Sequence, residues 1–235
     1  MNPSKELRTT IREVDTGNIR IRVEVPDAEQ LLDQHVMSEP SSSGSLDPYW
    51  AVLWDASIRT AQFCRTYLAD FFQAKKPGSA QSRNVLEIGC GLGVVGIAVA
   101  QMGFAVTFTD IVPDAVAAAL KNAARNNCAN CTGHVLDWRQ PLNHRYDIIV
   151  GSDVLYEEQL HASLLNTLQQ MLNRGGEVLI GDPGRSHAAT FAERATAGGW
   201  EVTLLNQNTG PLHAPQPAQF QVLKLVRGQG SHSNT

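Results

Sequence analysis

One segment, residues 87–96, constrains the fold of this chain of 235 residues more than any other. It reads EIGCGLGVVG, follows the apolar residues Val85 and Leu86, and opens an apolar run that continues to about Met102. Glycines at this density let the backbone turn sharply and approach a bound ligand closely. The segment therefore predicts a buried strand, a ligand-binding turn and a helix in immediate succession. A tight structural turn without a ligand is the alternative.

The rest of the chain repeats the order of strand and helix. Strands that alternate with helices require right-handed crossovers and build a doubly wound parallel sheet. The last two apolar runs are joined by a proline-rich loop, 210–218, which favours an antiparallel final pair. We therefore expect an α/β fold with a seven-stranded, mostly parallel sheet, helices on both faces and an antiparallel C-terminal hairpin. The predicted strands are 85–88, 104–109, 132–136, 146–151, 177–181, 200–205 and 220–226, and the predicted helices are 56–72, 94–102, 113–127, 159–172 and 188–197, with Asn-Arg-Gly-Gly at 173–176 ending the fourth helix.

The first 46 residues are predicted to form an extension outside this sheet. Residues 19–25 alternate strictly between apolar and charged side chains, which is typical of a strand with one buried face. The serine-rich stretch 41–45 predicts a flexible connector at the boundary. We expect the main domain at 47–228 and a disordered tail at 229–235.

Composition excludes several classes of protein. Hydrophobic residues make up 43% of the chain and charged residues 18%, which is ordinary for a globular protein and too apolar for a disordered one. The 19 Lys and Arg against 23 Asp and Glu give a net charge of −4, so we expect no nucleic-acid partner. The N-terminal residues are polar, and the longest apolar stretch, around 94–100, is far short of the ~20 residues that cross a bilayer. We therefore expect no signal peptide, no membrane partner and a cytoplasmic location.

The four cysteines predict neither a disulfide framework nor a metal site. Cys128 and Cys131 form a CxxC pair, but no second pair or adjacent histidine cluster completes a tetrahedral zinc site. We expect ordinary reduced thiols and no metal, with zinc binding or redox chemistry at the pair as the alternative.

The glycine segment fits two nucleotide-binding patterns. Gly91, Gly93 and Gly96 form the GxGxxG of dinucleotide-binding turns. Read from Glu87, with Gly89 as its first glycine, the same segment spells ExGxGxG, the pattern of nucleotide-dependent methyltransferases. A carboxylate at the turn would repel a pyrophosphate, whereas it favours the ammonium and sulfonium groups of S-adenosylmethionine (SAM). The pattern therefore favours SAM over NAD.

Acidic residues follow several of the predicted strands, and the carboxyl ends of parallel strands meet at one edge of a sheet, where α/β proteins bind ligands. Asp110 can accept both ribose hydroxyls of a nucleotide, or it can cap the helix at 113–127. Asp137 can accept from an adenine amino group while Trp138 lies against the ring, or both can be ordinary turn residues. We expect one crevice to be surrounded by the carboxylates of Glu87, Asp110, Asp137, Asp153 and Asp182.

Five segments carry a resemblance to a known family, and they are LWDAS at 53–57, VLEIGCGLG at 85–93, TD at 109–110, DVLY at 153–156 and IGDPGR at 180–185. From about Pro48 to Val226 the chain resembles the seven-strand protein-lysine methyltransferases of methyltransferase family 16. The Trp before the first helix and the DxxY after the fourth strand are more specific than the glycine motif, which indicates only the wider class. LWDAS and DVLY resemble the enzymes that act on chaperones and valosin-containing protein. IGDPGR resembles the group that acts on the β-subunit of electron-transfer flavoprotein.

The resemblance implies a Rossmann-like class I methyltransferase that uses SAM, releases S-adenosylhomocysteine (SAH) and methylates a lysine of a protein substrate. It implies that Asp153 and Tyr156 are catalytic residues that position this lysine. Packing roles are the alternatives for Trp54 and Tyr156. Two other functions stay open, namely methyl transfer to a small-molecule amine or another nucleophile, and SAM or NAD binding without catalysis. The cofactor-binding residues that the resemblance implies are Trp54, Glu87, Gly89, Cys90, Gly91, Gly93, Asp110, Ile111, Asp137, Trp138 and Ser152.

Overall fold

The computed structural model describes residues 7–37, 48–69 and 83–228. Within these ranges no helix is both long enough and apolar enough to cross a bilayer. The strands are β1 (Thr9–Asp15), β2 (Arg20–Pro26), β3 (Asn84–Ile88), β4 (Ala105–Asp110), β5 (Cys131–Val135), β6 (Tyr146–Ser152), β7 (Leu172–Asp182), β8 (Trp200–Leu205), β9 (Pro211–Leu212) and β10 (Gln221–Arg227). The helices are α1 (Ala28–Met37), α2 (Asp55–Tyr67), α4 (Val94–Ala100), α5 (Pro113–Arg125), α6 (His161–Met171) and α7 (His187–Ala197), with the 3-10 helices η1 (Pro48–Ala51) and η2 (Glu158–Leu160).

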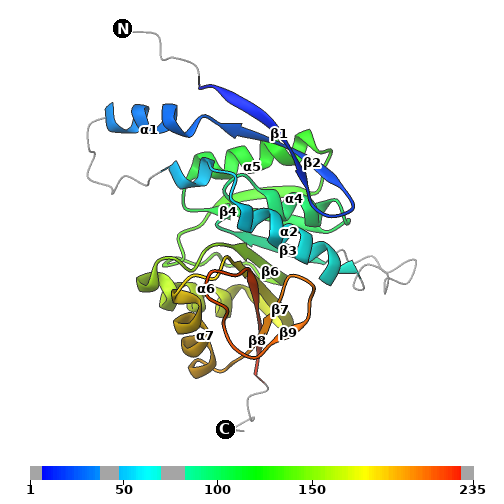
Figure 1. Cartoon of the computed structure of the whole chain (residues 1–235), viewed down its shortest axis with the longest axis vertical. Helices are drawn as coiled ribbons and strands as arrows, with labels where there is room; N and C mark the ends of the chain where they lie inside the picture. The colour runs from blue at the N-terminus through cyan, green and yellow to red at the C-terminus, as the bar shows by residue number, and fades with distance from the viewer. Residues whose placement is uncertain (1–6, 38–47, 70–82, 229–235) are drawn as a thin grey trace.

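Eight strands form one sheet in the order β5-β4-β3-β6-β7-β10-β8-β9, while β1 and β2 form a separate antiparallel hairpin (Figure 1). The strands from β5 to β7 are parallel, and β10 runs antiparallel between β7 and β8. The expected parallel sheet with antiparallel C-terminal strands is therefore confirmed. The two-residue strand β9, inside the proline-rich loop, adds an eighth member that the sequence did not predict.

Two hydrophobic cores lie on opposite faces of the sheet, because successive residues of a strand point to opposite sides. In β3, Val85 packs into a core that α2, α4 and α5 cover, and Leu86 packs into a core that α6 and α7 cover. Figure 1 shows these two groups of helices on either side of the sheet. Cover on both faces explains why the central strands are apolar throughout.

The register of the parallel strands places the loops that follow them side by side. Ile88, the last residue of β3, pairs with Thr109 of β4 and with Gly151 of β6. Ser152, the last residue of β6, pairs with Gly181 of β7. The loops after these four strands therefore leave the sheet at one edge.

Two further segments differ from expectation. The predicted strand at 19–25 is β2, but its partner β1 and the helix α1 were not predicted; β1 is exposed at almost every residue, so no apolar periodicity marks it. The fourth helix ends just before residues 173–176, as predicted, but β7 begins at Leu172 and not at residue 177. Leu172 pairs with Tyr146 of β6 and Glu177 with Ile148, so the register of this pairing shifts across residues 173–176, where Gly175 has a φ of +76°. The connector predicted at 41–45 and the tail predicted at 229–235 lie outside the described residues.

Polar contacts anchor the N-terminal hairpin to α5, beside which it lies in Figure 1. Glu24 of β2 forms ion pairs with Lys121 and Arg125 of this helix. Asn122, which is only 1% exposed, accepts the Glu24 N–H at 2.7 Å and donates to the carbonyl of Leu92 at 3.1 Å. One buried amide side chain therefore connects the hairpin, α5 and the glycine segment.

Replacing Asn122 by Ala leaves the Glu24 N–H and the Leu92 carbonyl without their buried partner. We expect the free energy of unfolding to fall by about 2–4 kcal/mol, because each buried polar group that loses its hydrogen bond costs about 1–3 kcal/mol. Urea unfolding followed by circular dichroism measures this change. Asn166→Ala, at an exposed position of α6, is the matched control and should change stability by less than about 0.5 kcal/mol. Equal effects of the two substitutions would contradict the anchoring role.

Candidate functional site

A cavity of about 800 Å³ opens at the carboxyl edge of the parallel strands. Its walls come from the loops after β3, β4, β5, β6 and β7, from η1 and from the start of α2. None of the described residues of the N-terminal hairpin lines it. Every residue predicted for the site except Gly93 and Asp182 does so, namely Trp54, Glu87, Gly89, Cys90, Gly91, Asp110, Ile111, Asp137, Trp138, Ser152, Asp153 and Tyr156.

The glycine segment forms the wall beyond β3. Glycine is required at positions 91 and 93 for different structural reasons. Gly91 has a φ of +47°, and a Cβ there would lie 3.0 Å from the carbonyl oxygen of Trp50, so this close approach requires glycine. At Gly93, a Cβ would lie 2.8 Å from the Cβ of Ala119 in α5. Glycine at this position therefore allows α4 to pack closely against α5, and the predicted contact of Gly93 with a cofactor stays a prediction.

The carboxyl group of Glu87 is bound to the start of α4. This residue is only 2% exposed, and its Oε2 accepts the Gly96 N–H at 2.9 Å. Burial raises the pKa of Glu87 to about 8, and the nearby Asp110 adds to the rise while the α4 amides oppose it. At neutral pH the neutral carboxyl form predominates. The attraction of a cation that the sequence suggested for Glu87 is therefore weaker than a free carboxylate would supply.

The Asp110 carboxylate connects two of the loops. Its Oδ2 accepts the Gly91 N–H and its Oδ1 accepts the Val112 N–H, both at 3.0 Å. Burial raises the pKa of Asp110, and these amides oppose the rise. A backbone hydrogen bond from Ile111 also lowers the pKa of Asp110, and because a carboxylate has about four acceptor positions, one remains for a ligand. Ile111, the next residue, is 41% exposed and adds an apolar surface to the same wall.

Asp137 and Trp138 lie on the wall beyond β5, where the sequence predicted contacts with an adenine ring. The Asp137 carboxylate accepts from the Arg139 side chain in a two-pronged pair, with Nε–Oδ1 at 2.9 Å and Nη2–Oδ2 at 2.6 Å. The hydrogen bonds from Arg139 lower the pKa of Asp137. The backbone carbonyl of Trp138 accepts the hydroxyl of Thr167, which fixes the loop to α6.

Asp153 and Tyr156 lie beside an arginine for which the sequence predicted no role. Arg185, in the loop after β7, donates from Nε to Asp153 Oδ1 at 2.5 Å and from Nη2 to Oδ2 at 2.7 Å. Its guanidinium carbon lies 5.7 Å from the centre of the Tyr156 ring. Asp153 itself has a φ of +56°, a left-handed conformation that Asp tolerates better than most residues.

Asp182 does not join the crevice of carboxylates that the sequence predicted. Its side chain is fully buried, and Oδ1 accepts the backbone N–H groups of Gly184 at 2.7 Å and Arg185 at 2.8 Å. Its Oδ2 has no hydrogen-bond partner among the described residues. Asp182 is therefore a scaffold for the loop that carries Arg185.

The role of Arg185 was missed, although a signal for it exists in the sequence. Asp153 follows β6 and Arg185 follows β7, and neighbouring parallel strands bring the residues after their ends together. Tyr49 of η1 was missed as well. It is 58% exposed, lines the cavity and lies with its ring 6.4 Å from that of Trp54, whose Nε1 donates to the Tyr49 carbonyl.

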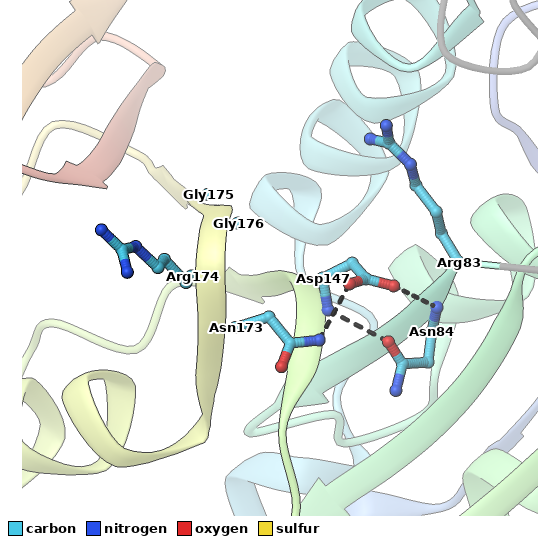
Figure 2. Close-up of a pocket in the computed structure, with 7 residues that line it drawn as sticks. All are labelled: Arg83, Asn84, Asp147, Asn173, Arg174, Gly175 and Gly176. Atoms are coloured by element: carbon cyan, nitrogen blue, oxygen red, sulfur yellow. Dashed lines mark hydrogen bonds between the residues drawn. The ribbon is translucent and has the colours of Figure 1, made fainter.

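A second pocket lies at the opposite edge of the sheet, where β3, β6 and β7 begin (Figure 2). The Asp147 carboxylate at its centre accepts the Asn84 N–H at 3.2 Å and the Asn173 side-chain amide at 2.8 Å. Figure 2 shows the side chains of Arg83 and Arg174 directed away from this carboxylate. These polar groups hold the strand ends together, and their arrangement presents no convergent site for a ligand.

The CxxC pair is not part of the cavity. Cys128 and Cys131 are free thiols that hydrogen-bond to each other, which lowers the pKa of Cys128 and raises that of Cys131. In the described part of the chain, no group of three or more His, Cys, Asp or Glu residues is arranged to hold a metal ion.

Comparison with known proteins shows similarity over the segment that carries the site residues. A family model described as lysine methyltransferase matches residues 45–195. The chain is 34% identical over 149 residues to the electron transfer flavoprotein beta subunit lysine methyltransferase of Danio rerio, covering 60% of this chain and 52% of that protein. It is 28% identical over 146 residues to EEF1A lysine methyltransferase 3 of Xenopus tropicalis, covering 60% of this chain and 61% of that protein. The chain thus spans less than two thirds of the length of these relatives.

Solved structures share the fold at lower sequence identity. A TehB-like SAM-dependent methyltransferase from Corynebacterium glutamicum matches with a TM-score of 0.55 and 21% identity, covering 69% of this chain and 86% of that one. A ribosomal protein L11 methylase from Lactobacillus delbrueckii matches with a TM-score of 0.56 and 17% identity, covering 73% of this chain and 80% of that one. These likenesses confirm the predicted Rossmann-like class I methyltransferase architecture.

The raised pKa of Glu87 predicts how stability depends on pH. The folded protein holds a proton up to about pH 8, whereas an exposed carboxyl releases it near 4.5, so this contribution to stability is complete below about pH 4.5 and is lost as the pH rises to about 8. Glu87→Gln removes the ionisable group and keeps an acceptor for Gly96. We expect the free energy of unfolding of this variant to fall less with rising pH, the difference being about 1.4 kcal/mol for each unit of the pKa shift.

Urea unfolding at about pH 5.5 and about pH 8.5 measures this difference. Glu201→Gln, at an exposed position of β8, is the control and should leave the pH dependence of the wild type unchanged. The assigned ionisation state is wrong if Glu87→Gln and the wild type lose the same stability between the two pH values.

Proposed function

The chain belongs to the family-16 lysine methyltransferases, whose model covers residues 45–195, and we propose that it transfers a methyl group from SAM to a lysine side chain of a protein. One observation carries the proposal: a single cavity joins the glycine segment and Asp110 to the Asp153–Tyr156 pair. A nucleotide-binding wall and an amine-accepting wall therefore face the same space. The relatives named as lysine methyltransferases support a protein as the acceptor, and a cytoplasmic site of action is part of the same proposal.

The residues present fit SAM. The volume of about 800 Å³ lies within the range of sites for small ligands and cofactors. The Asp110 carboxylate lines the cavity with acceptor capacity left for the ribose, and Ile111 and Trp138 offer apolar surfaces for the adenine ring. Gly89 and Gly91 both have a positive φ and carry no side chain, so the methionine end can approach the backbone at these two positions of the loop after β3.

A dinucleotide fits this site less well. A pyrophosphate binds to backbone amides at a helix N-terminus, and the Gly96 N–H is one of the amides in the first turn of α4. In this structure it already donates to Glu87 at 2.9 Å. The ExGxGxG pattern and the hydrogen bonding therefore favour SAM over NAD.

When bound, SAM would supply a methyl group on a positively charged sulfur: the C–S bond would break as the amine nitrogen bonds to the methyl carbon, SAH would leave, and one amine proton would go to solvent. The protein orients the two partners, and such positioning can account for roughly 7–11 kcal/mol of a barrier in favourable cases. Asp153 accepts a hydrogen bond from the acceptor amine and thereby directs its lone pair. Tyr156, which is 47% exposed at the cavity mouth, shapes the channel for the lysine chain.

Isothermal titration calorimetry of the wild type should show binding of SAM and none of NAD. Asp110→Asn replaces the charged acceptor by a neutral amide and should weaken SAM binding about 10- to 100-fold, because hydrogen bonds to charged groups contribute about 1.5–3 kcal/mol. Asp114→Asn, at an exposed position in the first turn of α5, is the matched control and should bind SAM like the wild type. Tight binding of NAD without binding of SAM would overturn the assignment of the cofactor.

Incubation of a cell lysate with the protein and isotopically labelled SAM should place the label on lysine residues of proteins, identified by mass spectrometry. Asp153→Asn should lower this incorporation at least about tenfold while SAM binding is retained, because the amine loses its charged acceptor. Label found only on small molecules would favour the alternative acceptor class. Full activity of Asp153→Asn would remove Asp153 from the acceptor site.

A further inference from the structure

The Asp153–Arg185 ion pair is built into the fold at the wall of the proposed acceptor site. Both distances, 2.5 and 2.7 Å, are those of a two-pronged carboxylate–guanidinium pair, which is more directional than a single contact. The Asp153 side chain is only 10% exposed and that of Arg185 is 38% exposed, so the carboxylate lies behind its partner. The negative charge of the Asp153 carboxylate is therefore already balanced by Arg185 when an acceptor amine enters the site.

The loop that carries Arg185 is fixed from the opposite side. The buried Asp182 accepts the backbone N–H groups of Gly184 and Arg185. Gly184 has a φ of +91°, and a Cβ there would lie 2.5 Å from the backbone N of Ala218. The Gly184 carbonyl in turn accepts the Ala218 N–H at 2.9 Å. Three hydrogen bonds of the Gly184 and Arg185 backbone therefore fix the position from which the Arg185 side chain extends.

The surroundings of the pair contain more acids than bases. Asp110, Glu157 and Asp153 all raise the pKa of Tyr156 after burial, which contributes most, whereas Arg185 lowers it. Asp153 raises the pKa of Arg185, chiefly through their hydrogen bonds, so the guanidinium stays charged. The titratable groups that act electrostatically on Asp153, Tyr156 or Arg185 are Asp110 after β4, Glu157 after β6 and Asp182 at the end of β7, while Glu158 of η2 pairs with His187 and Arg194 of α7.

On the basis of the proposed function, we propose that Arg185 is a positioning residue that neutralises Asp153, so that the acceptor site orients a lysine amine without stabilising its protonated form. An ammonium group cannot attack SAM, because its lone pair is occupied. A lysine pKa of about 10.4 leaves almost no neutral amine at pH 7, and an unpaired carboxylate at hydrogen-bond distance would raise this pKa further. The Arg185 guanidinium prevents this further rise of the lysine pKa and leaves acceptor positions on Asp153 free.

The first test needs no acceptor protein and uses SAM and SAH as probes. The two molecules differ by a positively charged methyl group, and in-line transfer requires this group to lie next to the acceptor site. We expect Arg185→Gln to raise the preference for SAM over SAH by about three- to tenfold, because the Asp153 charge is then unbalanced. Arg185→Lys keeps the positive charge and should restore the wild-type preference. Calorimetry gives both affinities for each variant.

Arg194→Gln is the matched control for these variants. Arg194 of α7 pairs with Glu158 at 2.5 Å and does not line the cavity, so its loss should leave the preference for SAM over SAH unchanged. Thermal unfolding verifies that each variant is folded. An unchanged preference in folded Arg185→Gln would overturn the inference.

The second test is the pH dependence of kcat, measured with a saturating amount of the acceptor protein isolated in the labelling experiment. Arg185→Gln should move the rise of kcat to higher pH by about one unit or more, and Arg185→Lys should reverse most of this shift. Faster turnover of Arg185→Gln without a shift would show that Arg185 blocks the site, and would overturn the inference. Failure of the wild type to label any lysine would instead overturn the proposed function, while the SAM and SAH affinities would still decide whether Arg185 neutralises Asp153.

Discussion

The structure depends most on buried carboxylates at the ends of parallel strands that bind the backbone amides of the adjoining loops. Asp110, at the end of β4, accepts N–H groups from Gly91 in the loop after β3 and from Val112 in its own loop. Glu87 accepts the Gly96 N–H at the start of α4. Loops that surround a cavity have few backbone partners, and buried amides without partners are costly. The acids therefore determine the shape of the cavity before they contact any ligand.

The sheet could be predicted from the sequence because each central strand is a short apolar run bounded by polar or glycine residues. Both faces of such a strand are covered, and this burial is local enough to be visible in residues such as 146–151. The failures occur where pairing depends on distant partners. β1 is exposed to solvent at almost every residue, so only its pairing with β2 defines it as a strand. The start of β7 is defined by the pairing of Leu172 with Tyr146 of β6. Glycines at 175 and 176 hide that pairing, because they are typical of turns.

The positions of the site residues could be predicted, but the directions of their side chains could not. Strand ends meet at one edge, so residues directly after them line one cavity, as Asp110 and Asp153 do. The partner of each carboxylate depends on the backbone of the next loop, which the sequence pattern does not specify. Asp182 binds the amides of its own loop for this reason, and Gly93 packs against α5 because α5 crosses directly above it. Arg185, like Asp153, lies in a loop that directly follows a parallel strand. It could be recognised only by considering the loops after β6 and β7 together.

Charge balance explains how a site rich in acids can serve this chemistry. A methyl donor with a positive sulfur favours negative charge nearby, whereas an acceptor lysine must lose its proton and therefore disfavours it. The cavity meets both demands by pairing two of its acids with arginines, Asp137 with Arg139 and Asp153 with Arg185, and by keeping Glu87 largely neutral through burial. Asp110, on the wall assigned to the ribose, accepts backbone amides and forms no ion pair with a lysine or arginine among the described residues. Recognition of the two substrates then rests on the geometry of hydrogen bonds, and the net charge of −4 contributes little to it.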